Sequence, residues 1–349
     1  MDDLDKLIEV VIKEGASDLH ISEDRVPYIR VSGQLIPLLK TPKFTKAIMG
    51  GIVSRVLSET KKATLKEIQS ADLSYNYKEN RFRTHIFVDQ QKLCMALRRI
   101  PKKIPSLAEL NLPPELENFA RLKSGFFLVV GPTGHGKSTT LASMIESINV
   151  ERLENIITIE DPIEYLFEAK KSIIHQREVG MDTPSFASAL HDSFRADVNV
   201  IMVGEMRDSD TISTAVSAAE TGHLVFSTLH TNNASQTVDR IIDSFTAGQQ
   251  NQVRVQLASS LSGIFSQRLI PRISGGLIPA YELLVNNVAV SNLIRDKRTH
   301  EINTMIETGS QEGMIDFNRC LVEKVNKGDI TIENAYLYSS NPRALEKML

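Results

Sequence analysis

The segment that most constrains this chain is residues 131–138, Gly-Pro-Thr-Gly-His-Gly-Lys-Ser, which fits the pattern Gly-x-x-x-x-Gly-Lys-Ser/Thr. The apolar run 126–130 precedes it and predicts a buried strand, and residues 139–148 predict the helix that follows it. Glycines let a backbone pass close to anionic oxygens, and a helix start adds partial positive charge. Strand, loop and helix together predict a nucleoside triphosphate site.

The residue types in this loop have separate chemical uses. Successive backbone N–H groups form an anion nest. Lys137 is expected to reach the β- and γ-phosphates, and the Ser138 hydroxyl is expected to bind Mg²⁺. The predicted ATP-binding residues are Gly131, Pro132, Thr133, Gly134, His135, Gly136, Lys137, Ser138 and Thr139.

Length and composition narrow the class of protein. With 349 residues the chain suggests two domains, and 42% apolar and 24% charged residues are ordinary for a globular protein. A formal charge of −3 disfavours binding to nucleic acid through phosphate neutralisation. The longest apolar runs are too short to span a membrane, and the acidic N-terminus lacks the layout of a signal peptide. Cys94 and Cys320 form no paired spacing, so neither a disulfide framework nor a zinc site is expected, and a reducing cytoplasm fits.

The hydrophobic pattern divides the chain into an N-terminal α/β domain at 1–99, a proline- and lysine-containing linker at 100–106, and a second domain at 107–349. In the first domain it predicts a helix over 4–13, strands at 18–22, 28–32 and 81–88, and a hairpin turning at Ser32-Gly33. In the second it predicts strands at 126–130, 156–159, 200–203 and 224–228, alternating with helices, and a mainly helical stretch over the last seventy residues. Such alternation favours a parallel sheet, whose ligands bind at the carboxyl ends of the strands.

Polar side chains follow these strands at that end. Glu205 comes directly after the strand at 200–203 and is expected to hold Mg²⁺ directly or through water. Glu160, Asp161 and Glu164 crowd another strand end, where one carboxylate can polarise an attacking water, although a solvated acidic loop has the same pattern.

Two histidines, His223 and His230, bracket the strand at 224–228. A histidine beside a strand is more often an ordinary core or surface residue than a catalytic one. His230 follows the strand at the active edge of the sheet, so sensing of the γ-phosphate by this side chain is the functional hypothesis.

Four segments in this order resemble the Walker A, Asp box, Walker B and His box of the secretion-superfamily ATPases: residues 131–141, 159–164, 204–208 and 220–230. Residues 16–20, 98–101 and 289–296 also resemble that family, and the last segment lies near a motif associated with type IV pilus retraction ATPases. The resemblance implies a hexamer of chains, each with a PAS-like N-terminal α/β domain, a RecA-like P-loop ATPase domain and a helical C-terminal region. It implies that Glu164 is the catalytic glutamate, Glu205 the Walker B acid, and His223 and His230 the His box. Arginines of the N-terminal domain would contribute to nucleotide sites as the ring closes; the matching residues are Arg81, Arg83 and Arg98.

The function that this resemblance implies is ATP-driven pilus retraction and twitching motility, in the cytoplasm at the inner face of the membrane, with an inner-membrane platform protein as partner. The chain departs from the family at His135, where Ser is common, at 196–199, and at Ser291 and Asp296. The absence of a cysteine cluster favours retraction over extension. The alternatives are an accessory retraction ATPase, for which Asn232-Asn233-Ala234 speaks, a secretion ATPase, a RecA-like nucleic-acid translocase, and an ATP-sensing module without turnover.

Overall fold

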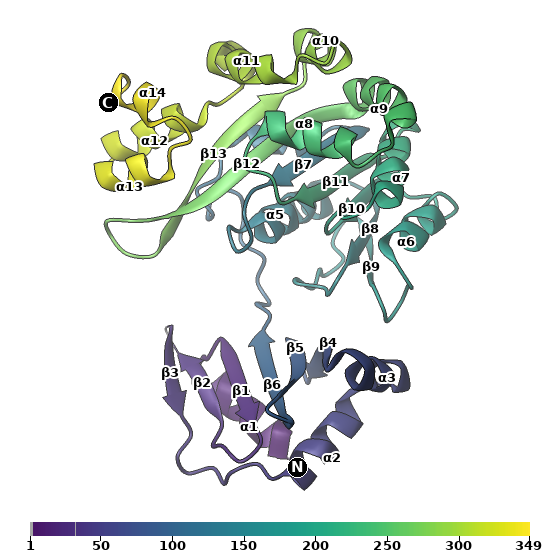
Figure 1. Ribbon diagram of the computed structural model, residues 1–349, viewed down its shortest axis with the longest axis vertical. Coiled ribbons are helices and arrows are strands. Elements are labelled where there is room, and N and C mark those ends of the chain that lie inside the picture. The colour runs from purple at the N-terminus through teal and green to yellow at the C-terminus, as the bar shows by residue number, and fades with distance from the viewer. Residues whose placement is uncertain (1–2, 32) are drawn as a thin grey trace. The chain divides into compact units, whose positions relative to one another are not determined.

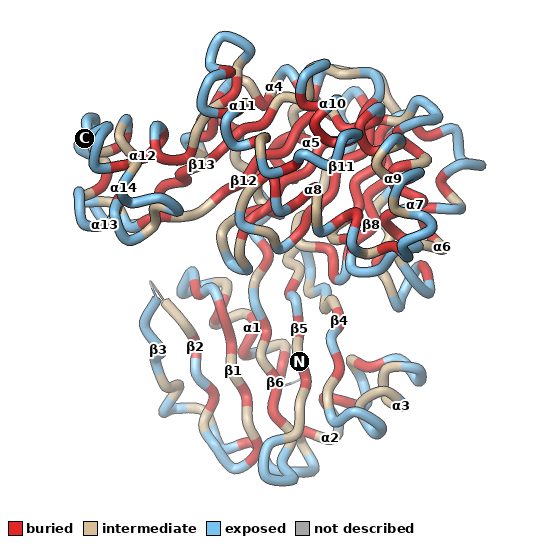
Figure 2. Tube along the Cα trace, turned by 45° about the horizontal axis from the view of Figure 1, so that its top comes forward, coloured by how far each residue is buried: buried red, intermediate tan, exposed pale blue. Residues whose placement is uncertain are grey.

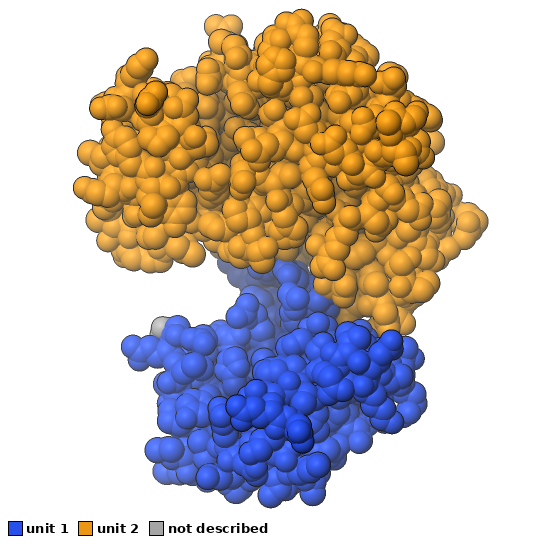
Figure 3. Space-filling view, viewed as in Figure 1, with its two compact units in different colours: residues 1–103, 162–166 blue, residues 104–161, 167–349 orange. Residues whose placement is uncertain are grey.

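The computed structural model describes residues 3–31 and 33–349, which form two compact units (Figure 3). One unit is the chain up to residue 103 together with 162–166, and the other is 104–161 together with 167–349. The change of unit after residue 103 falls inside the segment for which the sequence predicts a linker. The domain limits of 1–99 and 107–349 stay predictions, and no sequence pattern indicates that 162–166 groups with the first unit.

The first unit is built around a sheet in the order β3-β2-β1-β6-β5-β4, in which all described neighbours run antiparallel (Figure 1). Its strands are β1 (Asp18–Ser22), β2 (Tyr28–Val31), β3 (Gln34–Pro37), β4 (Ser70–Tyr77), β5 (Asn80–Asp89) and β6 (Lys92–Arg99). Its helices are α1 (Asp3–Lys13), α2 (Lys46–Val56) and α3 (Glu59–Ile68).

Local sequence accounts for the first elements of this unit. Helix α1 buries Leu4, Leu7, Ile8 and Val11, the spacing of one helix face, and the chain leaves the helix at Gly15 with φ of +62°. Strands β2 and β3 form the predicted hairpin, with Val31 opposite Gln34. Of the predicted turn residues, Ser32 lies outside the described residues.

The second unit contains a mixed sheet in the order β13-β12-β7-β11-β10-β8-β9. All its neighbouring strands are parallel except the antiparallel pair β12 and β13. Its strands are β7 (Gly125–Val130), β8 (Asn155–Glu160), β9 (Ile173–Glu178), β10 (Val200–Val203), β11 (Leu224–Leu229), β12 (Leu261–Pro271) and β13 (Leu277–Val285). Its α-helices are α4 (Glu115–Ala120), α5 (Lys137–Glu151), α6 (Phe186–Ser193), α7 (Ser209–Glu220), α8 (Ala234–Asp243), α9 (Ala247–Ser260), α10 (Val288–Arg295), α11 (Ile302–Thr308), α12 (Phe317–Asn326), α13 (Ile332–Tyr338) and α14 (Pro342–Glu346).

The core of this unit lies on both faces of the sheet. Strands β7 and β11 are buried at every position. Figure 2 shows many buried segments, in red, in the interior of this unit. Alternate residues of β7 point to opposite faces: Phe126 and Leu128 join a cluster with α7 to α10, whereas Phe127 packs with α4 and α5. Continuous apolar strands covered by helices on both faces are the signature of a parallel α/β sheet. The predicted α/β class and its four strands are confirmed.

Strands β12 and β13 are the main elements that the sequence analysis missed. They form a long antiparallel ribbon, visible in Figure 1, whose distal part packs through Ile270 and Ile278 against Phe317 and Leu321 of α12. After β13 the chain is mainly helical, as predicted. Over residues 3–31 and 33–349, none of the helices is both long and apolar enough to cross a bilayer.

Candidate nucleotide-binding site

The site is set by four adjacent strands. β7, β11, β10 and β8 are neighbours and parallel, so their carboxyl ends lie at one edge of the sheet. The loop 131–136 follows β7, Glu205 follows β10 at a distance of one glycine, and His230 follows β11. Glu160 is the last residue of β8. The topology therefore brings together the loop and three of the predicted side chains.

The loop between β7 and α5 packs directly against β12. At Gly131 the backbone has φ of +144°, and a Cβ there would lie 2.2 Å from the carbonyl oxygen of Gln267. At Gly136 a Cβ would lie 2.9 Å from the Gln267 amide nitrogen, Nε2. Real Cβ atoms do not approach other atoms so closely, so the glycines are needed where β12 passes.

Replacing Gly131 with Ala is expected to destabilise the second unit strongly, because the new methyl group would collide with a backbone carbonyl that cannot move aside. We expect a loss of about 2–4 kcal/mol in the free energy of unfolding, measured by urea denaturation. Gly134→Ala is the matched control: φ is +79° there, but nothing lies within 4 Å of the new Cβ. It should cost only about 1–2 kcal/mol of backbone strain. Equal losses in the two variants would contradict the packing argument.

Lys137 connects the loop to the ends of β11 and β10. Its Nζ donates to the carbonyl oxygens of Gly131 and Pro132, each at 2.9 Å, and lies 3.3 Å from Nδ1 of His230. A lysine ammonium has only donors, so Nδ1 of His230 is the acceptor in this contact. The other ring nitrogen of His230, Nε2, lies 3.5 Å from Oε2 of Glu205. A line of contacts thus runs from the phosphate loop to the acid after β10.

Arg207 closes this line of contacts. Its guanidinium pairs with Oε1 of Glu205, and this hydrogen bond raises the pKa of Arg207 further. The charge of Asp161 acts on Arg207 in the same direction. The Glu205 side chain is 17% exposed, and its two oxygens lie against Arg207 and His230. The arrangement holds Glu205 as an oriented carboxylate.

Glu160 and Asp161 differ in their surroundings. Glu160 is buried, and its Oε1 accepts from the Thr158 hydroxyl at 2.7 Å and from the Gln176 amide at 3.3 Å. Its main chain also lies close to Gly204, where a Cβ would come 3.2 Å from the Ile159 carbonyl oxygen. Asp161 is exposed. Glu160 therefore fixes the end of β8 against β10, and Asp161 is the more accessible carboxylate.

Glu164 groups with the first unit, where its Oε1 lies 3.4 Å from Nη1 of Arg83. Arg83 on β5 is directly opposite Arg98 on β6, and Arg81 lies two positions away on the same face of β5. Like charges in directly opposite positions repel unless acids compensate them. Here Glu164 pairs with Arg83, and Asp18 accepts from Nε of Arg98 at 2.8 Å. The structure thus gathers all three predicted arginines on one face.

Asp18 is the carboxylate that pairs with Arg98 on this sheet face. Burial alone would raise its pKa, but hydrogen bonds from Arg98 and Ser17 and the charge of Arg98 hold the pKa of Asp18 below its ordinary value. Its opposite neighbour on the other side, Arg30, has Nε 3.8 Å away. Asp18 therefore stays ionised and orients the guanidinium of Arg98, which is itself 72% exposed.

His223 is not brought to the loop. It precedes β11, whereas His230 follows it, and a strand of this length separates them by roughly 20 Å. The Nδ1 of His223 lies 3.0 Å from the Ala218 carbonyl oxygen, and the ring meets Phe194 edge-on. Within its own chain His223 fixes the turn from α7 into β11.

Comparison with known proteins identifies the family. A family model described as "Type II/IV secretion system protein" matches residues 1–310. This chain belongs to that family. The Pseudomonas aeruginosa protein named type IV pilus retractation ATPase PilT is 39% identical over 334 residues, which cover 95% of this chain and 97% of PilT. The type IV pilus ATPase PilU of the same organism is 37% identical, covering 99% of this chain and 91% of PilU.

A crystal structure of the pilus retraction motor PilT with bound ADP has the same fold. It is 44% identical, has a TM-score of 0.91, and the two chains cover each other completely, at 100% each. The predicted secretion-superfamily ATPase fold and the predicted enzyme class, an ATPase, are confirmed by this membership.

Two residues of this secretion-family site escaped the sequence analysis. Gln267 lies inside a strand that was not predicted, and no motif marks it. Arg207 lies within the Walker B segment 204–208, only two positions after Glu205. A cation so close to the acid in the sequence could have predicted their ion pair.

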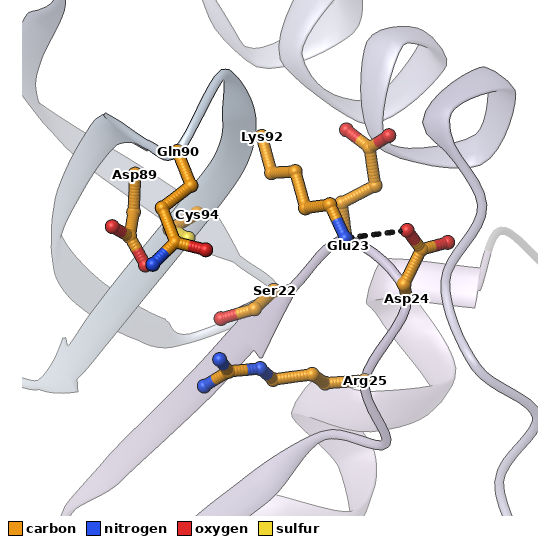
Figure 4. A pocket seen from close by; sticks show the side chains of 8 residues that line it. All are labelled: Ser22, Glu23, Asp24, Arg25, Asp89, Gln90, Lys92 and Cys94. Atoms are coloured by element: carbon orange, nitrogen blue, oxygen red, sulfur yellow. Dashed lines mark ion pairs between the residues drawn. The ribbon is translucent and has the colours of Figure 1, made fainter.

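The cavity shown in Figure 4 is not the nucleotide site of this secretion-family chain. It lies in the first unit, has a volume of about 110 Å³, and carries a Lys92–Asp24 ion pair at 2.8 Å. Ligand pockets usually have about 300–1,000 Å³, so this cavity is too small for a nucleotide. Its lining residues are Ser22, Glu23, Asp24, Arg25, Asp89, Gln90, Lys92 and Cys94.

Proposed function

We propose that this chain is the ATP-driven motor of type IV pilus retraction and works as a ring of six copies. The carrying observation is the agreement along the whole chain with the retraction motor PilT, at 44% identity and a TM-score of 0.91. The contacts among Lys137, His230 and Glu205 support it, because they give the chain the parts of a working phosphate site. In solution with ATP, light scattering should give six times the 38.9 kDa mass of one chain.

Within this proposal, residues 131–139 bind ATP, and Ser138 and Glu205 hold Mg²⁺. A hydroxyl and a carboxylate are oxygen donors of the kind that Mg²⁺ prefers, and the ion would neutralise phosphate charge. Glu164 polarises the attacking water. His230 senses the γ-phosphate through its contact with the Lys137 ammonium. Glu160 fixes the end of β8 beside the site, and Asp161 adds negative charge there. His223 has no catalytic role in this proposal because it lies at the other end of β11.

The arginines of the first unit would convert nucleotide state into movement. Arg81, Arg83 and Arg98 share one sheet face, and a guanidinium fork matches phosphate oxygens. In a ring, such a face would reach a nucleotide only when the first unit closes over the nucleotide site. ATP and ADP offer different phosphates to the arginines, so they would favour different degrees of closure. The hinge would be the segment 100–106. The ring would act in the cytoplasm at the inner face of the membrane, on an inner-membrane pilus platform protein, and no nucleic acid is involved.

Deletion of the gene in its host tests the proposed function. Pili that are assembled but not depolymerised should accumulate, so we expect cells with surplus surface pili and no twitching motility. A plasmid copy of the natural gene should restore both, whereas a Lys137→Ala copy should not. Bald cells would contradict the retraction assignment and point to assembly.

A second candidate is an accessory retraction ATPase, favoured by the 37% identity to PilU. The Asn232-Asn233-Ala234 segment does not decide for it, since Asn233 caps α8 by accepting from the Gln236 N–H. An accessory motor works beside another retraction ATPase. Its deletion should therefore leave pilus numbers near normal and lower retraction under load, which electron microscopy and pulling measurements on single pili would distinguish.

A further inference from the structure

His135 makes a contact that ties the phosphate loop to β12. Its ring Nδ1 accepts a hydrogen bond of 2.8 Å from the backbone N–H of Leu269. Strand β12 pairs with β7 only as far as Ser266, which lies opposite Val130. Beyond that point no strand residue of β7 remains to accept from β12. The imidazole therefore takes the place of the next strand carbonyl and extends the sheet's hydrogen bonding into the loop.

Gln267 makes a second tie two residues earlier. Its Nε2 donates to the His135 carbonyl oxygen at 2.8 Å, and its Oε1 accepts from the Thr140 hydroxyl at 2.6 Å. Gln267 and Thr140 are buried, at 3% and 1% exposure. In a trans peptide the C=O and the following N–H point in opposite directions. Holding the His135 carbonyl toward Gln267 therefore turns the Gly136 N–H away from β12, toward the inside of the loop.

We propose that His135 and Gln267 form a latch that holds the phosphate loop in its nucleotide-binding shape, with the neutral His135 ring as acceptor for the Leu269 N–H. This inference rests on the proposed nucleotide binding. Both are positioning residues: they act on the phosphates through the backbone N–H groups that they orient. Without the latch the loop samples other shapes, and binding must first order it again, which lowers affinity.

The surroundings of His135 keep the ring neutral. Burial lowers its pKa from the ordinary value of 6.5, and the positive charges of Arg268 on β12 and Lys137 on α5 lower it further. Protonation would turn Nδ1 into a donor facing the Leu269 donor, so the bond would break. Because the pKa is lowered in the folded chain, the latch is complete above pH 6.5 and is lost as the pH falls through the lowered value.

The decisive variant is His135→Asn. Oδ1 of Asn stands at the same place along the side chain as Nδ1 of His, so it can accept from Leu269, but it does not titrate. His135→Leu keeps bulk and removes the acceptor. His300→Asn is the matched control, because His300 is 76% exposed on the second unit. The dissociation constant of a fluorescent ADP with Mg²⁺ is measured for each full-length protein from pH 8 to pH 5.5.

At pH 8 the natural chain, His135→Asn and His300→Asn should agree within about twofold, and His135→Leu should bind about fivefold more weakly, as the loss of one hydrogen bond predicts. As the pH falls below 6.5, the natural chain and His300→Asn should bind progressively more weakly than His135→Asn, and the ratio should approach about fivefold once the His135 ring is protonated. Effects of pH on the phosphates and on side chains that all the variants share cancel in these ratios.

Three outcomes would overturn the latch: a His135→Leu variant that binds normally at pH 8, a His135→Asn variant that binds as weakly as His135→Leu at pH 8, or a His300→Asn variant that binds as weakly as His135→Leu at pH 8. Thermal unfolding without nucleotide shows whether the His135→Leu variant folds. If that variant does not fold, the comparison of the natural chain with His135→Asn still tests the latch. Failure of the natural chain to bind ADP at pH 8 would instead contradict the proposed function.

Discussion

Glu164→Gln is expected to bind ATP with near-normal affinity and to hydrolyse it about 100- to 10,000-fold more slowly. The amide keeps the shape of the carboxylate but cannot take a proton from water. The change also weakens the ion pair between Glu164 and Arg83. The side chains of this pair are 40% and 45% exposed, respectively. Exposed pairs contribute about 0–1 kcal/mol, so the fold should survive. Phosphate release measures turnover, and fluorescent ATP measures binding.

The matched control for that experiment is Glu168→Gln. Glu168 lies on the same segment and is exposed. It should hydrolyse ATP at the natural rate. Near-normal hydrolysis by Glu164→Gln would remove Glu164 from the catalytic role, and Asp161 would then be the next carboxylate to test. A loss of ATP binding by Glu164→Gln would mean that it acts on affinity rather than on the chemical step.

Lys137→Ala should weaken nucleotide binding by about 10- to 100-fold, since charge-assisted hydrogen bonds to phosphate are among the strongest in proteins. The substitution also removes the donor that holds the Gly131 and Pro132 carbonyls and contacts His230. We therefore expect ADP with Mg²⁺ to raise the melting temperature of the natural chain but not that of Lys137→Ala. Fluorescent-ADP titration gives the affinity.

Lys123→Ala, on the exposed segment before β7, is the matched control and should bind normally. Lys137→Arg should not rescue binding, because a planar guanidinium does not fit the place of a compact ammonium. If Lys137→Ala binds ADP like the natural chain while remaining folded, the nucleotide site is not in this loop.

The sequence sufficed for elements whose signal is local. β7 and β11 are continuous apolar runs, so their position and burial could be predicted, and α1 follows one amphipathic period. Helix α5 begins at Lys137 and ends at Glu151, beyond the predicted 139–148, because the loop itself supplies its N-terminus. β12 and β13 were missed because their pairing with each other and with β7 joins segments far apart in the chain.

For the site too, local motifs could be predicted from the sequence, whereas contacts between distant segments could not. Motifs located the loop, Glu205 and His230, since each follows its own strand. The contact between His135 and Leu269 joins residues 134 positions apart, and nothing in either neighbourhood announces it. His223 precedes β11, so its position at the end of the strand away from the loop could also have been predicted from strand direction. Pairing of Glu164 with Arg83 depends on tertiary structure, across 81 positions.

The close passage of β12 has a consequence for engineering and for divergence. A phosphate loop is usually regarded as a module that can be exchanged between relatives. In this chain the loop is fitted to one strand, through the bare α-carbon of Gly131 and the ring of His135. A loop transplanted from a relative with Ser at position 135 would bring no ring to meet the Leu269 amide. A transplanted loop therefore fits the backbone of β12 only if it keeps a glycine at 131 and a hydrogen-bond acceptor at 135.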